Sequence, residues 1–261
     1  MTALRVALLT LPSAMSDAAS LAFARDLGGR LMLLGVSDPM RPNAGGTFGP
    51  LRRHWARSGA RMLPYLALGF GVPGRRGAFR RVAGAAFTIV RDVNGAAFLD
   101  TLRAARVDLV VTLHFDQILA PETIAAARLG GINLHPSLLP RHRGPIPAFW
   151  ALAEGGADTG VSLHRLAPRI DAGALLAQQR VVLPSDISAL EAARRLHLAG
   201  LPLLGEALAR IEASGMPEGT EIPLLPYRGF PDVAALRDAA RRGVHLVRPR
   251  DLPACLPWAK P

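Results

Sequence analysis

An amide and an imidazole stand two residues apart in the run GGINLHPSLLPRHRGPIPAFWAL, residues 130–152. Successive side chains of an extended strand alternate between its two faces, so Asn133 and His135 share one face and the apolar residues share the other. Pro136 ends the strand, because its nitrogen cannot donate to the ladder of a sheet. The sequence therefore predicts both groups at the carboxyl end of an apolar strand, where open α/β sheets bind ligands.

A carboxylate follows in the loop PRIDAG, where Asp171 lies between Pro168 and Gly173. These three groups are able to catalyse acyl transfer. The amide N–H can stabilise an oxyanion on a carbonyl, the imidazole can stabilise that charge or move a proton, and the carboxylate can orient the imidazole. No Ser or Cys nucleophile is needed if the substrate brings its own amine. On spacing alone a plainer interpretation is favoured, in which the amide and imidazole bind loop backbone and Asp171 caps a turn.

Further elements extend this pattern in a fixed order. They read Asn-x-His-x-Ser-Leu-Leu-Pro, Arg-Gly-x-x-Pro, Thr-Gly-Val and Asp-x-Gly. Here they are Asn133, His135, residues 137–140, Arg143, Gly144, Pro147, residues 159–161, Asp171 and Gly173. In order and spacing the string resembles the folate-dependent formyltransferase family over about residues 80–185. The resemblance implies a Rossmann-like α/β domain, a mostly parallel sheet flanked by helices, that moves a formyl group from 10-formyltetrahydrofolate to an amine.

The resemblance also assigns roles to individual residues. The implied catalytic triad is Asn133, His135 and Asp171. The pterin ring of the folate is expected between residues 114–121 and 166–171, where backbone groups do much of the recognition. The candidate folate contacts are Phe115, Gln117, Ile118, Leu119, Leu166 and Ile170. The candidate contacts to the acceptor substrate are Ser13, Ser137 and Arg143. Phe115, Ile118 and Leu119 fit a plain core equally well.

The remaining polar candidates have weaker claims. His114 stays open because it lies near the folate loop, whereas His142 is predicted on the surface, His164 as a structural strand residue and His197 as a core residue. The single Cys255 excludes an intrachain disulfide framework and a Cys-rich zinc site, and nothing else resembles a metal cluster. The first strand ends in LPSAMSD rather than a glycine-rich turn, so a dinucleotide cofactor is not expected.

Alternating strands and helices must position these groups. Apolar runs predict strands at residues 4–11, 30–36, 87–90, 107–113, 131–135, 160–166 and 175–183. Asn94 is placed to cap one helix and Ser188 another, which Pro202 should kink or split. Strand, helix and strand in succession indicate a parallel sheet with right-handed crossovers, in agreement with the fold that the resemblance implies.

Length and composition limit the domain organisation. The 261 residues, half of them hydrophobic, suit one domain with an extension. We expect a catalytic domain over 1–215 with a basic insertion at about 38–85, and a short C-terminal extension over 216–261. No apolar run reaches the roughly 18 residues of a membrane span, and the N-terminus lacks a convincing signal-peptide cleavage site. With one cysteine, a cytoplasmic location is expected.

The net charge of +11 is concentrated in one segment. Residues 39–91 hold ten Arg and no Asp or Glu, which accounts for +10 of it. One interpretation is a helix that packs Leu63, Leu66 and Phe70 on the core or on a second subunit while its arginines are solvated. The others are a lid for an anionic acceptor and a segment resting on anionic lipid. The first is favoured, because Arg, with 30 residues against one Lys, is this chain's default basic residue.

These observations favour an N-formyltransferase acting on the primary amine of a small soluble acceptor, such as a nucleotide-linked amino sugar or a biosynthetic amine. A methionyl-tRNA formyltransferase usually adds a C-terminal barrel of about 100 residues, for which too little chain remains. A formyltetrahydrofolate hydrolase usually has a small domain before the catalytic one, whereas this chain starts with the first strand. A folate-binding protein on a retired catalytic domain is the non-enzyme alternative, and the three retained site residues argue against it. Nucleic-acid binding is not favoured, and the acceptor and any homo-oligomer stay open.

Overall fold

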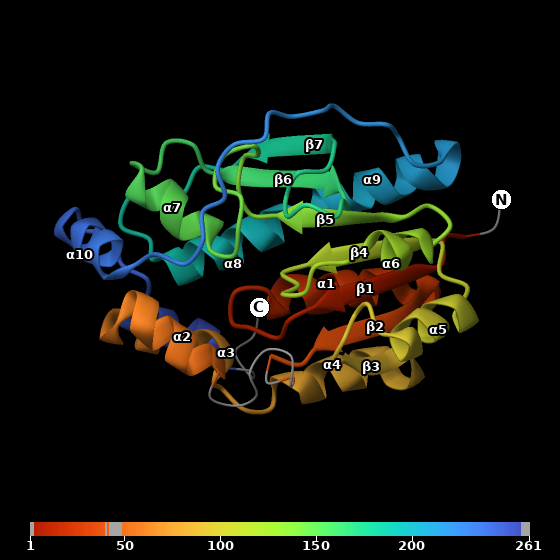
Figure 1. Ribbon diagram of the computed structural model, residues 1–261, viewed down its shortest axis with the longest axis horizontal. Coiled ribbons are helices and arrows are strands. Elements are labelled where there is room, and N and C mark those ends of the chain that lie inside the picture. The colour runs from red at the N-terminus through yellow and green to blue at the C-terminus, as the bar shows by residue number, and fades with distance from the viewer. Residues whose placement is uncertain (1–2, 40, 42–48, 257–261) are drawn as a thin grey trace.

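Within the residues that the computed structural model describes, 3–39, 41 and 49–256, seven strands form a single sheet. The strands are β1 (Val6–Thr10), β2 (Leu31–Ser37), β3 (Phe87–Val90), β4 (Leu109–Leu113), β5 (Gly131–His135), β6 (Gly160–Arg165) and β7 (Leu175–Arg180). The first five pair in parallel, whereas β6 is antiparallel to β5 and β7 to β6. Helices flank this sheet (Figure 1), and the predicted Rossmann-like α/β fold is confirmed.

The strand order β3-β2-β1-β4-β5-β6-β7 places a topological switch between β1 and β4. The chain moves outward from β1 to β3, crosses back to β4 and then moves outward on the other side. All residues of β1 and β4 are buried, because helices cover both faces, and this explains why both strands read as continuous apolar runs. Ligands of such sheets bind outside the carboxyl ends of the strands at the switch, so a site is expected at the ends of β1, β4 and β5.

Helices on the two faces divide the core into two clusters. The larger cluster is covered by α1 (Asp17–Leu27), α7 (Pro147–Ala153), α8 (Ala189–Ala199) and α9 (Leu201–Ser214), and the smaller by α5 (Ala96–Ala104) and α6 (Pro121–Ala125). Strand β1 shows the division, since Leu8 packs in the larger cluster and Ala7 and Leu9 pack in the smaller. No helix among the described residues is both long and apolar enough to cross a membrane.

The helical segment after β7 is capped and divided as predicted. The Ser188 hydroxyl accepts the backbone N–H of Glu191 at 3.1 Å and so caps α8. Helix α8 ends at Ala199 and α9 begins at Leu201. Pro202 causes the break, because it lacks the N–H that would continue α8 but fits the first turn of a new helix.

The basic insertion contributes to the core. Its helices are α2 (Gly49–Ser58), α3 (Leu63–Phe70) and α4 (Arg75–Ala83). Met62 and Phe79 are buried in the larger cluster, Leu66 and Phe70 pack against it, and Leu63 is half-buried. The predicted packing of the insertion on the core therefore holds for Leu66 and Phe70.

Arg75 is an exception to the expectation that the arginines of the insertion are solvated. Its side chain is buried, and its Nη1 pairs with a carboxylate oxygen of Asp17 at 2.6 Å. Its Nη2 donates to the carbonyls of Leu68 and Cys255. Asp17 also accepts the N–H of Ser13 at 2.7 Å, and burial raises the pKa of Asp17 while Arg75 opposes the rise. The ion pair between Arg75 and Asp17 thus joins the insertion to the turn between β1 and α1.

The C-terminal extension folds back across the carboxyl end of the sheet (Figure 1). Its extended part pairs once with β7, through an antiparallel bridge between Leu175 and Thr220. It then passes α7, where the Trp150 indole donates to the Gly229 carbonyl at 2.9 Å. Two helices follow, α10 (Val233–Arg241) and α11 (Leu252–Cys255). The extension therefore packs on the predicted catalytic domain, while the boundary near residue 215 stays a prediction.

Candidate active site

The three predicted catalytic side chains meet at the carboxyl end of β5. Asn133 and His135 extend from the same face of the strand, and Asp171 reaches them from the loop that joins β6 to β7. One carboxylate oxygen, Asp171 Oδ1, lies 3.5 Å from both His135 Nδ1 and Asn133 Nδ2. His135 is buried, and the other two side chains are half-buried. An amide donor, an imidazole and a carboxylate therefore share one centre.

The loop that carries Asp171 is held by the Arg-Gly element of the motif. Asp171 has a left-handed backbone, with φ at 47°, which is uncommon for a residue other than glycine. Its Oδ2 accepts the N–H of Gly144 at 2.9 Å. The Arg143 guanidinium donates to the carbonyls of Ile170 and Asp171. Two elements that lie 27 residues apart in the sequence thus fix the position of the carboxylate.

A partner on each side fixes the Asn133 amide. Its oxygen accepts from the Thr112 hydroxyl of β4 at 2.8 Å, and its nitrogen lies 2.9 Å from His164 Nε2 of β6. An amide nitrogen can only donate, so His164 Nε2 accepts, and the proton on Nδ1 donates to the Arg165 carbonyl at 2.8 Å. Burial lowers the pKa of His164 to about 4, so the ring is neutral at neutral pH and keeps this role.

His164, which the sequence predicts as a structural strand residue, thus contacts two side chains of the candidate site. Its ring nitrogen also lies 3.8 Å from Asp171 Oδ1. Asn133 and His164 are opposite each other in the antiparallel ladder of β5 and β6. The sequence carried one signal of this, since Ser162 and His164 alternate with apolar residues and must share a face. The sequence did not indicate that β6 pairs antiparallel with β5, and this pairing is what places His164 opposite Asn133.

A backbone carbonyl also orients the His135 ring. Its Nε2 donates to the carbonyl of His142 at 3.2 Å, while its Nδ1 faces Asp171. His142 itself is buried, with a left-handed backbone and its Nε2 3.0 Å from a carboxylate oxygen of Glu154. The prediction of His142 on the surface is therefore wrong. Its backbone conformation, which no local pattern signals, turns its carbonyl toward the site.

Replacing His164 with alanine is expected to lower the kcat of the reaction at this centre roughly tenfold, because the Asn133 amide loses the acceptor that fixes its orientation. His164→Gln, whose amide oxygen can accept from Asn133, should recover part of the loss. Steady-state rates with equal amounts of folded protein test this. Equal losses in both variants, or a matching loss of thermal stability, would indicate that His164 only supports the fold.

The two predicted folate loops meet at the smaller core cluster. Leu119 is buried there, and Phe115 and Leu166 pack against the cluster, one from each loop. The plain-core interpretation therefore holds for Leu119. It fails for Ile118, which is 52% exposed, and Ile170 is half-buried. The apolar walls that a flat ring needs are close together, and the folate contacts of these residues stay predictions.

Two amide side chains fasten the first of these loops. Gln117 Nε2 donates to the Ser37 hydroxyl and the Val90 carbonyl, each at 3.0 Å, at the ends of β2 and β3. Asn94 Nδ2 donates to the Ile118 carbonyl at 2.9 Å. The prediction that Asn94 caps α5 is wrong, because Gly95 occupies the cap position. The side chain of Gln117 is therefore engaged in shaping the loop.

Two of the three predicted acceptor contacts position the site loops. The Ser137 hydroxyl donates to the Arg141 carbonyl at 3.0 Å, and the Ser137 carbonyl accepts from Ser162 Oγ at 2.6 Å. Arg143 is 5% exposed, and its guanidinium donates to backbone carbonyls on two loops. A direct role of Ser137 and Arg143 in binding the acceptor stays a prediction.

His114 closes the carboxyl ends of β1 and β4, together with the third predicted acceptor contact, Ser13. His114 has a left-handed backbone, and its Nδ1 lies 3.0 Å from the hydroxyls of both Ser13 and Ser16. Its ring stacks 5.9 Å from Phe70 and lies 5.6 Å from the His197 ring. Burial lowers the pKa of His114 to about 4 and that of His197 to about 3. His114 thus belongs to a closed polar cluster, and His197 is the buried residue that its helical position predicted.

The free energy of unfolding is expected to fall as the pH drops from about 6.5 toward about 4. His114, His164 and His197 are neutral when folded, but in the unfolded chain they regain their ordinary pKa of 6.5 and bind protons in this range. Each contributes a slope of at most about 1.4 kcal/mol per pH unit. Urea unfolding at about pH 7 and at about pH 5 measures the change. His197→Leu should flatten the dependence, and an unchanged slope in this variant would contradict the assignment.

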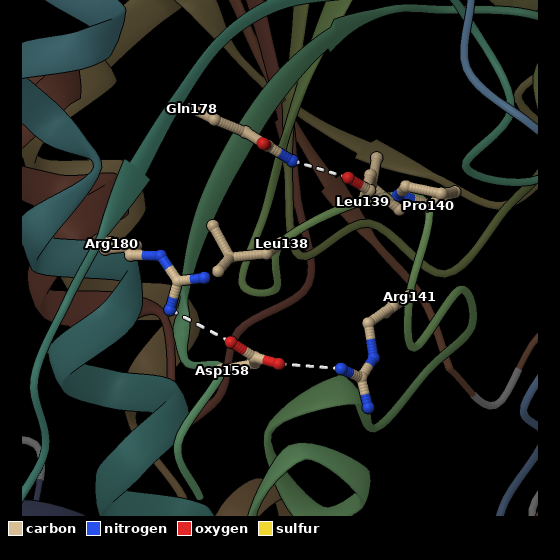
Figure 2. Close-up of a pocket in the computed structure, with 7 residues that line it drawn as sticks. All are labelled: Leu138, Leu139, Pro140, Arg141, Asp158, Gln178 and Arg180. Atoms are coloured by element: carbon tan, nitrogen blue, oxygen red, sulfur yellow. Dashed lines mark hydrogen bonds and ion pairs between the residues drawn. The ribbon is translucent and has the colours of Figure 1, made fainter.

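A hollow of about 410 Å³ lies beside the 138–141 loop. Its lining residues are Leu138, Leu139, Pro140, Arg141, Asp158, Gln178 and Arg180 (Figure 2). Asp158 bridges the two arginines at 2.7 and 2.9 Å, and Gln178 donates to the Leu139 carbonyl at 2.6 Å. The lining includes none of the three catalytic candidates. The predicted pocket between residues 114–121 and 166–171 therefore stays a prediction.

The chemistry that this centre offers is electrostatic and acid–base. The Asn133 amide nitrogen can donate to a developing oxyanion, and His135 and Asp171 can carry or stabilise a proton beside it. Among the described residues, no three His, Cys, Asp or Glu side chains are grouped so as to hold a metal ion. This set of groups suits acyl transfer to an incoming nucleophile.

The fold and this centre agree with one family of group-transferring enzymes. The family model for formyl transferases matches residues 83–208, which contain all three catalytic candidates. This segment is thus similar to formyl transferases, and the predicted resemblance to the folate-dependent formyltransferase family is confirmed. The matched segment begins just before β3 and ends within α9.

Solved structures of formyltransferases share the fold over most of the chain. A phosphoribosylglycinamide formyltransferase from Anaplasma phagocytophilum has 20% identity and a TM-score of 0.59, with 87% of this chain and 100% of that chain covered. A sugar N-formyltransferase from Shewanella sp FDAARGOS_354 has 17% identity and a TM-score of 0.55, with 86% and 76% covered. A sugar 3N-formyl transferase, solved in the presence of dTDP and 5-N-formyl-THF, has 12% identity and a TM-score of 0.57, with 88% and 70% covered.

Proposed function

We propose that the chain transfers a formyl group from 10-formyltetrahydrofolate to the primary amine of a small acceptor. The observation that carries the proposal is the convergence of Asn133, His135 and Asp171 within the segment that matches the formyl transferase family. The acceptor amine attacks the formyl carbon, and the bond from that carbon to the folate nitrogen breaks. The amine loses a proton and the folate nitrogen gains one, so the products are a formamide and tetrahydrofolate.

The geometry gives each side chain a part in this reaction. Asn133 Nδ2 donates to the oxyanion that forms on the formyl oxygen, and its contacts with Thr112 and His164 keep the amide in the donating orientation. His135 stabilises the same charge or moves the proton. Asp171 orients His135, and its own position is fixed by Gly144.

The choice of donor rests on the two loops and on the structural relatives. Residues 114–121 and 166–171 bring apolar side chains together in the smaller core cluster, as a wall for a flat pterin ring requires, and Ile118 is exposed. One protein of the same fold was solved in the presence of 5-N-formyl-THF, which supports a folate as the formyl donor. The phosphoribosylglycinamide and sugar enzymes of this fold support a small acceptor.

Release of tetrahydrofolate tests the proposal. The protein is given 10-formyltetrahydrofolate alone, and then with a panel of amines that includes amino sugars on nucleotides, phosphorylated amines and charged methionyl-tRNA. Release that requires a small amine, together with a formylated product found by mass spectrometry, is the expected result. Release with water alone would make the protein a hydrolase, and binding of folate without release would make it a folate-binding protein.

A further inference from the structure

The C-terminal extension is fastened to the dipeptide that holds the catalytic carboxylate. The carbonyl of Arg143 accepts the N–H of Arg228 at 2.7 Å. Gly144, whose N–H binds Asp171, has no room for a side chain, because a Cβ there would overlap the Arg228 carbonyl and lie 3.1 Å from the Tyr227 ring. With a φ of 127°, the position also favours glycine. Tyr227 therefore lies beside the anchor of the carboxylate.

Tyr227 is accessible to a ligand. Its side chain is 51% exposed, and those of Leu224 and Leu225 on the same stretch are 51% and 39% exposed. Partial burial raises the pKa of Tyr227, and the nearby charge of Asp171 adds to the rise. The phenol is thus protonated at neutral pH and able to donate. The stretch presents an aromatic face and a hydroxyl donor next to the reaction centre.

A guanidinium from the basic insertion reaches the same place. Arg57 of α2 donates through Nε to the carbonyl of Phe230, a residue 173 positions later in the chain. Its Nη2 lies 3.5 Å from where a Cβ on Gly229 would be, and the Tyr227 ring approaches that same point to 3.5 Å. The positive charge of Arg57 also lowers the pKa of Tyr227. The helix and the extension thus bring a cation and a phenol together.

The carboxylates near this place are already paired. Asp171 is bound by Gly144 and lies against His135, and Glu154 pairs with Arg228 at 2.7 Å. Residues 39–91 supply no carboxylate at all. An anion that approaches Tyr227 therefore meets the charge of Arg57 near carboxylates that already have partners.

The first strand–helix turn, where such a sheet often holds an anion, is occupied by groups of the protein itself. A phosphate often binds at the first strand–helix turn, on the N-terminus of the helix. Here the carboxylate of Asp17 lies at that end of α1 and pairs with Arg75. The half-buried His114 ring lies at the neighbouring strand end and contacts the Ser13 hydroxyl at 3.0 Å. A negatively charged acceptor must therefore place its charge elsewhere.

We propose that Arg57 and Tyr227 form a subsite for the phosphate of a phosphate-bearing acceptor, whose amine then reaches Asn133, His135 and Asp171. The inference rests on the proposed function, since it defines the substrate class of the same site. The Arg57 guanidinium pairs with phosphate oxygens, and the Tyr227 hydroxyl donates to them. The excess positive charge of residues 39–91 thereby gains a function at one position, Arg57, and the other arginines of the segment need have none.

Binding of inorganic pyrophosphate tests the subsite without catalysis. Calorimetric titration at low salt is expected to show binding to the wild type that Arg57→Gln weakens roughly tenfold or more and Tyr227→Phe weakens less. Arg52→Gln, an exposed arginine on the same helix, is the matched control and should bind as the wild type does. No binding to the wild type, or equal weakening by Arg52→Gln and Arg57→Gln, would overturn the proposal.

Formyl transfer separates the failure of this inference from the failure of the proposed function. With a phosphorylated amine that proves to be a substrate, Arg57→Gln should raise KM roughly tenfold or more and leave kcat nearly unchanged. The same variant should leave KM for the dephosphorylated amine unchanged. Transfer that is insensitive to Arg57→Gln would overturn the subsite alone. Pyrophosphate binding through Arg57 without transfer to any amine would overturn the proposed function, and the anion site would remain.

Discussion

Replacing Asn133 with alanine is expected to lower kcat for formyl transfer by on the order of 100-fold or more, because the oxyanion loses its amide donor. His135→Ala should lower kcat roughly 100- to 10,000-fold, since it removes the group that stabilises the oxyanion or moves the proton. Both side chains lie at the end of β5, so the core should survive either change. Initial rates of tetrahydrofolate release with a productive amine measure both effects.

The control for these variants is an amide that is outside the triad. Gln178 binds the Leu139 carbonyl and Ser162 Oγ beside the 410 Å³ hollow, and Gln178→Ala should change kcat little. Thermal unfolding of all three variants establishes that they are folded. If Asn133→Ala or His135→Ala retained wild-type activity, the assignment of this centre as the active site would be incorrect.

The strands were predictable from local rules, and the meeting of Asn133, His135 and Asp171 followed from the family resemblance. Fully buried parallel strands read as continuous apolar runs, and the alternation of side chains placed Asn133 and His135 on one face. The order and spacing of the motif elements, compared with the formyltransferase family, singled out Asp171, 38 residues after Asn133. Neither the strand pattern nor this comparison needed knowledge of strand pairing.

The supporting contacts could not be predicted, because they depend on pairing between distant segments. His164 faces Asn133 only because β6 runs antiparallel to β5, and His142 is turned inward by a left-handed backbone. Arg75 is buried by a pair with Asp17, 58 residues away. The net charge of residues 39–91 does not distinguish Arg75 from the solvated arginines of the same segment. The test of that segment must therefore exclude Arg75, whose replacement would disturb the fold.

Replacing Gly173 with alanine is expected to abolish most formyl transfer and to destabilise the protein. A Cβ at this position would overlap the backbone carbonyl of Arg165, which cannot move without breaking the β6 ladder. The loop that carries Asp171 would shift instead, and the carboxylate would leave His135 and Asn133. A displacement of about 1 Å can cost on the order of 100-fold in rate, so kcat should fall at least that far. Steady-state rates and the thermal unfolding midpoint measure the two effects.

Gly29→Ala is the matched control, because a Cβ there meets nothing within 4 Å. That variant should keep wild-type kcat and nearly wild-type stability. Gly173→Ala should also bind the folate donor poorly, since residues 166–171 form one of the two predicted walls of its site, and the loop ends at this glycine. A Gly173→Ala enzyme with wild-type kcat would show that the loop can relax without moving Asp171. In that case the close fit against Arg165 does not control the geometry of the centre.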